Sequence, residues 1–239
     1  MKKLLLLPFL FFALFTSCNK DEEDTFIPPT ETPAEEETPN EEETPTACFI
    51  THKDGLLIIE GESFNLKGQW KVASDEKASG GKYIQYIGAN SYNTQNLNNE
   101  ISVKFKVSAQ GNYLVRWYMR QPEEEATGDL ANDVWIYFPG NLGRAYIDGS
   151  PYVLEHYEKF VSRSGKDGEF AYGGALDLHE PKKSSSWMRV EFPEAGEYIL
   201  KICARSSLFQ LDKIVLSSGI SDTDAQENSK NLTESTTCD

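Results

Sequence analysis

Short runs of alternating apolar and polar residues fill the middle of the chain. They are rich in β-branched and aromatic residues and lie at 56–64, 82–88, 101–107, 113–121, 133–138, 187–193, 197–204 and 209–217. Turn-forming stretches such as Ser-Ala-Gln-Gly-Asn at 108–112 and Pro-Glu-Ala-Gly-Glu at 193–197 separate neighbouring runs. No segment keeps a helical period over three turns. The pattern therefore predicts an all-β domain, an antiparallel β-sandwich of the jelly-roll kind, over residues 48–218.

The N-terminal end has a different pattern. An apolar run at 4–15 follows Lys2 and Lys3 and ends in small residues before Cys18, which predicts a signal peptide at residues 1–17. The run is short for a membrane span. The residues before Cys18 resemble a bacterial lipobox, which implies that Cys18 is lipidated and becomes the first residue of the mature protein; plain secretion is the alternative.

The residues that follow Cys18 bear on location. The sequence Cys-Asn-Lys-Asp-Glu at 18–22 resembles the surface-export signal of lipoproteins from the Bacteroidetes. This resemblance implies an outer-membrane protein that is held by its lipid anchor and exposed at the cell surface.

Charge is spread unevenly along the chain. The formal net charge is −15, and residues 19–47 hold eleven acidic residues against one lysine. This stretch is rich in Glu, Thr and Pro and has few aliphatic residues, so it cannot bury enough surface to offset the entropy of folding. We expect residues 18–47 to be a disordered, extended tether. Because no basic patch is present, we expect no binding of nucleic acid.

The C-terminal end and the cysteines complete the domain plan. Residues 219–239 are polar and predict a disordered tail. Cys203 falls within a strand pattern, where it acts as a small apolar residue. Cys48 and Cys238 flank the domain, and a disulfide between them is possible in an oxidising compartment.

Two acidic residues of the first strand raise the question of a metal. Glu60 and Glu62 lie two positions apart, so both carboxylates leave the same face of a strand. A hard cation such as Ca²⁺ would satisfy them if Asp212 arrived from the last strand. On spacing alone, two exposed strand residues on a solvated face are the more common explanation.

Four blocks of sequence carry a resemblance to a known family. They are Ile-Ile-Glu-Gly-Glu-Ser-Phe at 58–64, Ser-Gly-Gly-Lys-Tyr-Ile-Gln-Tyr-Ile-Gly at 79–88, the strand–turn–strand stretch 103–117, and Phe-Gln-Leu-Asp-Lys-Ile-Val-Leu-Ser at 209–217. In this order they resemble galactose-binding-like β-sandwich carbohydrate-binding modules, family six and its relatives, as attached to marine polysaccharide-degrading enzymes. The resemblance spans most of residues 56–217.

The resemblance implies a metal site and a sugar site. A structural Ca²⁺ would be held by Glu60, Glu62, a backbone carbonyl in the region of Lys82, and Asp212. Tyr86 and Trp187 would be aromatic platforms for a sugar, although a strand aromatic such as Tyr86 is more often part of a core. Gln210 stands where the family usually has an Asn that hydrogen-bonds the sugar.

The stretch from Gln121 to Ser186 is longer than a compact module needs, and long loops on a sandwich often carry function. The residues in or beside it that could bind a ligand are Arg120, Asn132, Asp133, Trp135, Arg163 and His179. A groove of this composition would suit an acidic or sulfated polysaccharide. Internal salt bridges made by Arg120, Asp133 and Arg163 are an equally good interpretation.

Motifs for catalysis are missing from the sequence. It contains no Gly-x-Ser-x-Gly and no His-Glu-x-x-His, and no pair of acids is placed as glycoside hydrolysis requires. We therefore expect a non-enzymatic surface protein that binds a polysaccharide or oligosaccharide and captures it for nearby degrading enzymes or importers. The alternatives are an adhesin or assembly protein that binds another protein, and a small sandwich-fold glycoside hydrolase or lyase.

Overall fold

The structure, a computed structural model, describes residues 48–122, 130–178 and 185–238. All of them lie in one compact unit, Pro45–Asp239. The predicted signal peptide, the lipidation site Cys18, the tether and His179 lie outside the described residues. Within the described ranges, no helix is long and apolar enough to cross a membrane.

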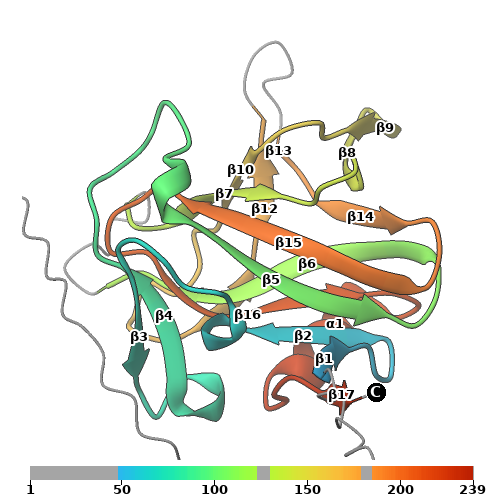
Figure 1. Cartoon of the computed structure of the whole chain (residues 1–239), viewed down its shortest axis with the longest axis horizontal. Helices are drawn as coiled ribbons and strands as arrows, with labels where there is room; N and C mark the ends of the chain where they lie inside the picture. Colours follow the sequence, from blue (N-terminus) through green and yellow to red (C-terminus); the bar gives the residue numbers. More distant parts are fainter. Residues whose placement is uncertain (1–47, 123–129, 179–184, 239) are drawn as a thin grey trace, which may run out of the picture. The chain divides into compact units, whose positions relative to one another are not determined.

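The described residues form a β-sandwich of two sheets (Figure 1). The first sheet has the order β13 (Ser185–Ser186), β12 (Ala175–Asp177), β10 (Glu158–Val161), β7 (Asp133–Tyr137), β15 (Gly196–Ala204), β5 (Glu100–Val107), β1 (Cys48–Thr51) and β17 (Thr236–Cys238). Its pairs are antiparallel except for the parallel pair of β1 with β5.

The second sheet has the order β3 (Trp70–Ser74), β4 (Lys82–Tyr86), β16 (Gln210–Ser217), β6 (Gly111–Arg120), β14 (Arg189–Phe192), β8 (Gly143–Ile147) and β9 (Ser150–Val153). In addition, β2 (Leu56–Glu60) pairs with β16, and β11 (Ala171–Gly173) pairs with β6. Short 3₁₀ turns lie at η1 (Gly61–Ser63), η2 (Ser79–Gly81) and η3 (Leu97–Asn99), and one helix, α1, spans Asp222–Ser229.

The core lies between the two sheets. Along β5, Ile101, Val103, Phe105 and Val107 are buried while the residues between them are not, as the alternating pattern predicts. The core-facing side of the second sheet includes Trp117, which packs edge-on against a phenylalanine of the first sheet. Each of the eight predicted strand segments overlaps an observed strand, so the predicted antiparallel sandwich is confirmed.

The C-terminal segment differs from expectation. The prediction of a disordered tail at 219–239 is wrong over most of its length, because α1 and β17 are formed there. Ala225 is fully buried in an apolar cluster with Leu56, Ile58 and Val215, on the face of the second sheet that points away from the core. The hydroxyl of Ser221 accepts a hydrogen bond from the backbone N–H of Asp224 and caps the helix. Figure 1 shows α1 beside β2 and β16.

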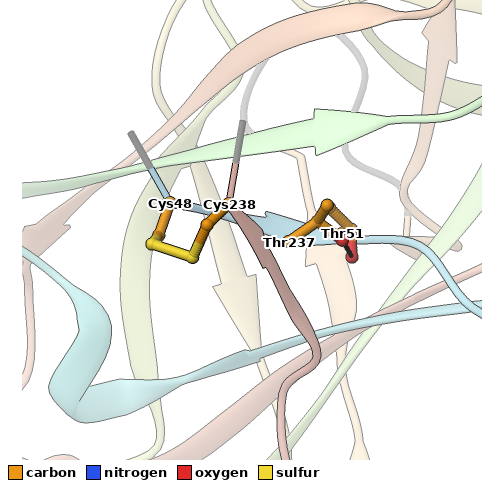
Figure 2. The surroundings of a disulfide bond; sticks show 4 residues. All are labelled: Cys48, Thr51, Thr237 and Cys238. Atoms are coloured by element: carbon orange, nitrogen blue, oxygen red, sulfur yellow. Dashed lines mark hydrogen bonds between the residues drawn. A yellow bond between two sulfur atoms is a disulfide. The ribbon is translucent and has the colours of Figure 1, made fainter. Parts of the chain in front are cut away.

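A disulfide fastens this segment to the start of the domain. Cys48 and Cys238 are bonded and face each other in the antiparallel pair of β1 and β17 (Figure 2). The hydroxyls of Thr51 and Thr237 lie 3.3 Å apart beside the bridge. The disulfide between Cys48 and Cys238 that the sequence allows is therefore formed. Cys203 is a free, buried cysteine whose thiol lies 3.0 Å from the carbonyl oxygen of Asn96.

Candidate functional site

The predicted metal residues Glu60 and Asp212 come together where β2 pairs with β16. Glu60 ends β2 and Asp212 lies in β16, and Ser79 connects them. The backbone N–H of Ser79 donates to Asp212 Oδ1 at 2.7 Å, and its hydroxyl donates to Glu60 Oε1 at 2.8 Å. Glu60 and Asp212 are buried, at 4% and 3% exposure, so Glu60 is not the solvated strand residue that spacing alone favours. Glu62 is half-buried and lies in η1, beyond the end of the strand.

This cluster of carboxylates is electrostatically strained. Burial raises the pKa of Glu60 to about 7, a rise that the hydrogen bond from Ser79 reduces and the charge of Asp212 increases. Burial likewise raises the pKa of Asp212 to about 6. Lys213 is fully buried next to them; its ammonium donates to the carbonyl oxygen of Leu232 at 2.6 Å, and burial lowers its pKa.

The cluster has oxygen atoms left for a cation. One carboxylate oxygen of Glu60 and one of Glu62 are buried without a hydrogen-bond partner. Carboxylate oxygens are the ligands that Ca²⁺ takes, so these residues fit the predicted ion in donor type. As placed, no group of three or more acidic, His or Cys side chains in the described ranges is gathered as a complete metal site. Lys82 is exposed at the start of β4, three residues beyond Ser79, and its carbonyl stays a predicted ligand.

The same burial argues against the cluster as a catalytic pair. Glycoside hydrolysis needs two carboxyl groups across an open cleft that admits the polymer. Here the carboxylate of Glu234 accepts hydrogen bonds from the Ser63 hydroxyl at 2.7 Å and from the backbone N–H of Glu60 at 3.1 Å. The C-terminal segment thus packs over the end of β2.

Tyr86 does not occupy the position of a platform. It is 2% exposed and its ring packs 5.3 Å from that of Trp70. Its hydroxyl donates to the carbonyl oxygen of Ala89 at 3.2 Å and accepts a hydrogen bond from the side chain of Asn99. The prediction of an exposed platform is therefore wrong for Tyr86, which belongs to the core.

The side chains of Arg120 and Gln210 are hydrogen-bonded to each other inside the protein. The Arg120 Nε donates to Gln210 Oε1 at 2.8 Å, and its Nη1 donates to Asp75 Oδ2 at 2.6 Å and to the carbonyl oxygen of Gly168. The guanidinium also lies 4.4 Å from the ring centroid of Phe170. Both side chains are buried, so the salt-bridge interpretation describes Arg120, and the predicted contact of this pair with a ligand is not supported.

Asn132, Asp133 and Trp135 also lie inside the protein, at 1%, 3% and 5% exposure. The carboxylate of Asp133 accepts from Arg205 and Ser206 and lies 3.5 Å from the ammonium of Lys159. The indole of Trp135 donates to the carbonyl oxygen of Ser91 at 3.0 Å. The predicted groove of Arg, Asn and Trp is therefore not formed by these residues, which order the loops instead.

Trp187 is the predicted platform residue that is exposed to solvent. It is 57% exposed, and no other aromatic side chain in the described ranges exposes more. It precedes β14, and its ring lies on Arg116 of β6, whose guanidinium carbon is 3.8 Å from the ring centroid. Because one face rests on Arg116, most of the exposed surface belongs to the opposite face and the ring edge.

Arg116 is held firmly beneath this ring. Its Nε and Nη2 donate to the two carboxylate oxygens of Asp222 in α1, at 3.1 and 2.5 Å, and its Nη1 donates to the carbonyl oxygen of Gly174 at 2.5 Å. The Tyr172 hydroxyl donates to the same carboxylate at 2.9 Å. A guanidinium with these partners fixes the plane of the indole, which favours a preformed stacking surface.

Two hollows flank Trp187 and share it as a wall. The smaller, of about 350 Å³, is lined by Tyr146, Ala175, Ser185, Ser186, Trp187 and Arg189. The larger, of about 690 Å³, is lined by strand β10, the loop 162–164, the glycines 173–174, Asp177 and again by Ala175, Ser185 and Trp187. Both volumes lie in the range of small-molecule sites.

Sequence reasoning missed most of this surface. Arg116 is a charged residue between Val115 and Trp117, which face the core, so alternation alone places its side chain on the outer face. Tyr146 carries no comparable signal, because it reaches Trp187 only through the pairing of β8 with β14. Arg189 lies two residues beyond Trp187, at the start of β14. Arg163, which was named in advance, lines the larger hollow.

The chain is similar in structure to several solved proteins. No protein-family model matches the chain, and no curated protein matches it significantly. A family 35 carbohydrate binding module from Clostridium thermocellum is 12% identical and has a TM-score of 0.43; the match covers 68% of this chain and 98% of the module. The C-terminal family 6 module of a marine laminarinase from Zobellia galactanivorans is 14% identical, with a TM-score of 0.41 and coverages of 68% and 99%.

A third similar structure is an exo-β-1,3-galactanase from Phanerochaete chrysosporium, solved with β-1,3-galactotriose. It is 16% identical, its TM-score is 0.36, and the match covers 68% of this chain and 29% of the galactanase. These similarities concern the fold, and no function is transferred from them.

Proposed function

We propose that this protein binds carbohydrate without transforming it, and that Trp187 is the platform of its binding site. The observation that carries the proposal is the exposed indole of Trp187, which rests on a buried guanidinium and forms a wall of two hollows. Sugars present flat C–H faces ringed by hydroxyls, so they are bound by an aromatic face together with a few polar groups. The hydroxyls of Ser162 and Ser164 in the larger hollow are groups of this kind.

The proposal includes the cellular setting that the sequence suggests. Lipidation at Cys18 would anchor the chain in the outer membrane, and the acidic stretch 18–47 would extend the domain away from the surface. Many tethered copies that face one repeating polymer gain avidity, so a weak single site is sufficient for capture. Neighbouring degrading enzymes or importers would then receive the polymer.

A Ca²⁺ ion completes the proposal as a structural component. Glu60, Glu62 and Asp212 would hold it, and the carbonyl of Lys82 is a further candidate ligand. When bound, the ion would neutralise buried carboxylates and join β2 to β16. The residues of this chain that prepare the site are Ser79, which orients two of the carboxylates, and Lys213, whose buried charge offsets part of theirs.

The test is retention of the full chain on affinity gels that contain neutral, uronate-rich or sulfated polysaccharides. We expect retention by at least one polymer, and Trp187→Ala should weaken it by roughly 1–3 kcal/mol, the magnitude of aromatic stacking on flat ligands. The matched control is Tyr92→Ala, which removes another exposed aromatic side chain away from both hollows.

Two outcomes would contradict the proposal. Unchanged retention of the Trp187→Ala variant would show that the sugar binds elsewhere. A folded chain that no polymer retains would favour a surface protein that binds another protein.

A further inference from the structure

Helix α1 is linked to the proposed platform without lining either hollow. No residue of Asp222–Ser229 borders the two spaces beside Trp187. The link is the carboxylate of Asp222, which holds the guanidinium on which the indole rests. We infer that the C-terminal segment is a positioning element of the sugar site and that Asp222 is its positioning residue. This inference rests on the proposed function and specifies what keeps that site in order.

The main chain around Trp187 is fixed on both sides. The hydroxyl of Ser186 accepts a hydrogen bond from the backbone N–H of Tyr146 at 2.8 Å. Met188 is 1% exposed, and its carbonyl oxygen accepts a backbone hydrogen bond from β6 at 2.9 Å. A fixed main chain still leaves the indole a choice of staggered rotamers. The guanidinium of Arg116, whose carbon lies 3.8 Å from the ring centroid, therefore selects the orientation of the ring.

The plane of this guanidinium depends on α1. Arg116 is 3% exposed; two of its nitrogens donate to the two carboxylate oxygens of Asp222, and a third donates to the carbonyl oxygen of Gly174. A parallel pair of hydrogen bonds fixes a planar group in a way that one contact cannot. Without the carboxylate, the guanidinium would keep the contact with Gly174 alone and could turn, and the indole above it would lose its support.

The position of Asp222 depends in turn on the docking of the whole helix. Ala225 is fully buried in the apolar cluster on the face of the second sheet that points away from the core. The hydroxyl of Tyr118 donates to the carbonyl oxygen of Gln226 at 2.8 Å. Beyond the helix, the disulfide fastens β17 to β1. Because the rest of α1 is polar and exposed, a few contacts decide whether it is docked, and the order of Trp187 follows from them.

The first test observes Trp187 directly, by fluorine NMR of the full chain labelled with fluorotryptophan. The chain has four tryptophans and the other three are buried, so the Trp187 resonance is recognised by its sensitivity to the solvent isotope and by its loss in Trp187→Ala. Asp222→Asn should broaden or shift this resonance alone, because the guanidinium loses its paired contact. General damage to the fold would instead move the resonances of the buried tryptophans as well.

A second variant reaches the indole through the helix. Ala225→Gln keeps Asp222 and the net charge but places a larger, polar side chain in the apolar cluster, so α1 should undock and the Trp187 resonance should change as it does in Asp222→Asn. One matched control is Asn228→Gln, which introduces the same side chain at an exposed position of α1; the other is Asp224→Asn, which removes the same charge elsewhere in the helix. Neither control should move the resonance.

The second test measures retention on affinity gels that contain laminarin, polygalacturonate or a sulfated galactan. On a gel that retains the wild type, Asp222→Asn and Ala225→Gln should each weaken binding roughly two- to tenfold, the cost of ordering a side chain that is no longer held in advance. Trp187→Ala should weaken binding further, and the two controls should leave it unchanged. Thermal unfolding of each variant checks that it is folded.

The outcomes separate this inference from the proposed function. An unchanged Trp187 resonance and unchanged retention in Asp222→Asn would overturn the inference and leave sugar binding intact. A change in Asp222→Asn that folded Ala225→Gln does not reproduce would also overturn it, because the helix would not be needed; if Ala225→Gln does not fold, Asp222→Asn decides alone. A disordered Trp187 in both variants of a chain that no gel retains would support the positioning role and contradict the proposed function.

Discussion

At the scale of single residues, Asp222 determines how firmly the platform is held. Its carboxylate accepts hydrogen bonds from the guanidinium of Arg116, which lies beneath Trp187, and from the hydroxyl of Tyr172 in β11. Burial alone would raise the pKa of Asp222, but these hydrogen bonds and the charge of Arg116 outweigh it, so the pKa lies below its ordinary value. The ionised carboxylate is therefore the form that stabilises the fold.

Replacement of Asp222 tests this through pH. A carboxyl whose pKa is lowered by folding adds stability above its ordinary pKa of about 4, and this stability is lost as pH falls through the folded pKa. Asp222→Asn should cost about 1–2 kcal/mol of unfolding free energy near neutral pH, a modest value because the side chain is 43% exposed. Urea unfolding across pH should show this cost shrinking below about pH 4.

The control for this experiment is Asp224→Asn, which removes the same charge from the same helix. Asp224 contacts the exposed Ser221 instead of Arg116, so its replacement should not show the same loss. A difference between wild type and Asp222→Asn that is constant with pH would contradict the ion-pair explanation.

Residue roles were predictable from the sequence only where a pattern fixes the direction of a side chain. Glu60 and Asp212 meet as the resemblance implies, because β2 and β16 are neighbours. Tyr86 shares its strand face with the fully buried Ile84, so alternation alone favours the core over a platform. Asp133 could not be assigned in advance, since its partners Arg205 and Ser206 follow β15 and lie 72 and 73 residues further along the chain.

At the scale of elements, local pattern found the long strands and missed the elements that depend on tertiary contacts. The predicted strands have their own alternation and turn signals. The short strands β9 and β11 have weak patterns and exist because they pair with β8 and β6. Helix α1 is polar apart from one alanine in its sequence, and only its packing on the second sheet and its cap reveal it.

The disulfide between β1 and β17 makes a prediction about this C-terminal element. It closes a loop with a sequence separation of 190 residues, which restricts the unfolded chain strongly. The double variant Cys48→Ser/Cys238→Ser should lose about 2–4 kcal/mol of unfolding free energy, measured by urea unfolding without reductant. Reductant should lower the stability of the wild type toward that of the variant and should leave the variant unchanged. Equal midpoints for the two proteins would show that α1 and β17 hold without the bridge.

At the scale of the whole molecule, two contacts connect N-terminal strands of the domain to C-terminal strands. The disulfide joins β1 to β17, and the carboxylate cluster lies where β2 meets β16. The C-terminal segment reaches both, because Glu234 and Leu232 contact the cluster directly before β17 begins. A cation in the cluster would therefore stabilise the pairing of β2 with β16 and the C-terminal segment that packs against it.

Calcium should act on global stability. At a concentration 100-fold above its dissociation constant, a ligand adds about 2.7 kcal/mol, which for a domain of this size raises the melting temperature by roughly 5–10 °C over a chelator. Asp212→Asn should abolish this rise. Because that variant also removes a buried negative charge beside Glu60, it should melt above the wild type in chelator and below it in calcium. The diagnostic result is that the variant melts above the wild type in chelator and below it in calcium, since simple damage to the fold would lower the melting temperature in both conditions.

Asp148→Asn, in the exposed turn between β8 and β9, controls for the loss of charge and should keep the full calcium effect. If the wild type melts at the same temperature in calcium and in chelator, the carboxylates are balanced by Lys213 and Ser79 alone and the metal assignment is wrong.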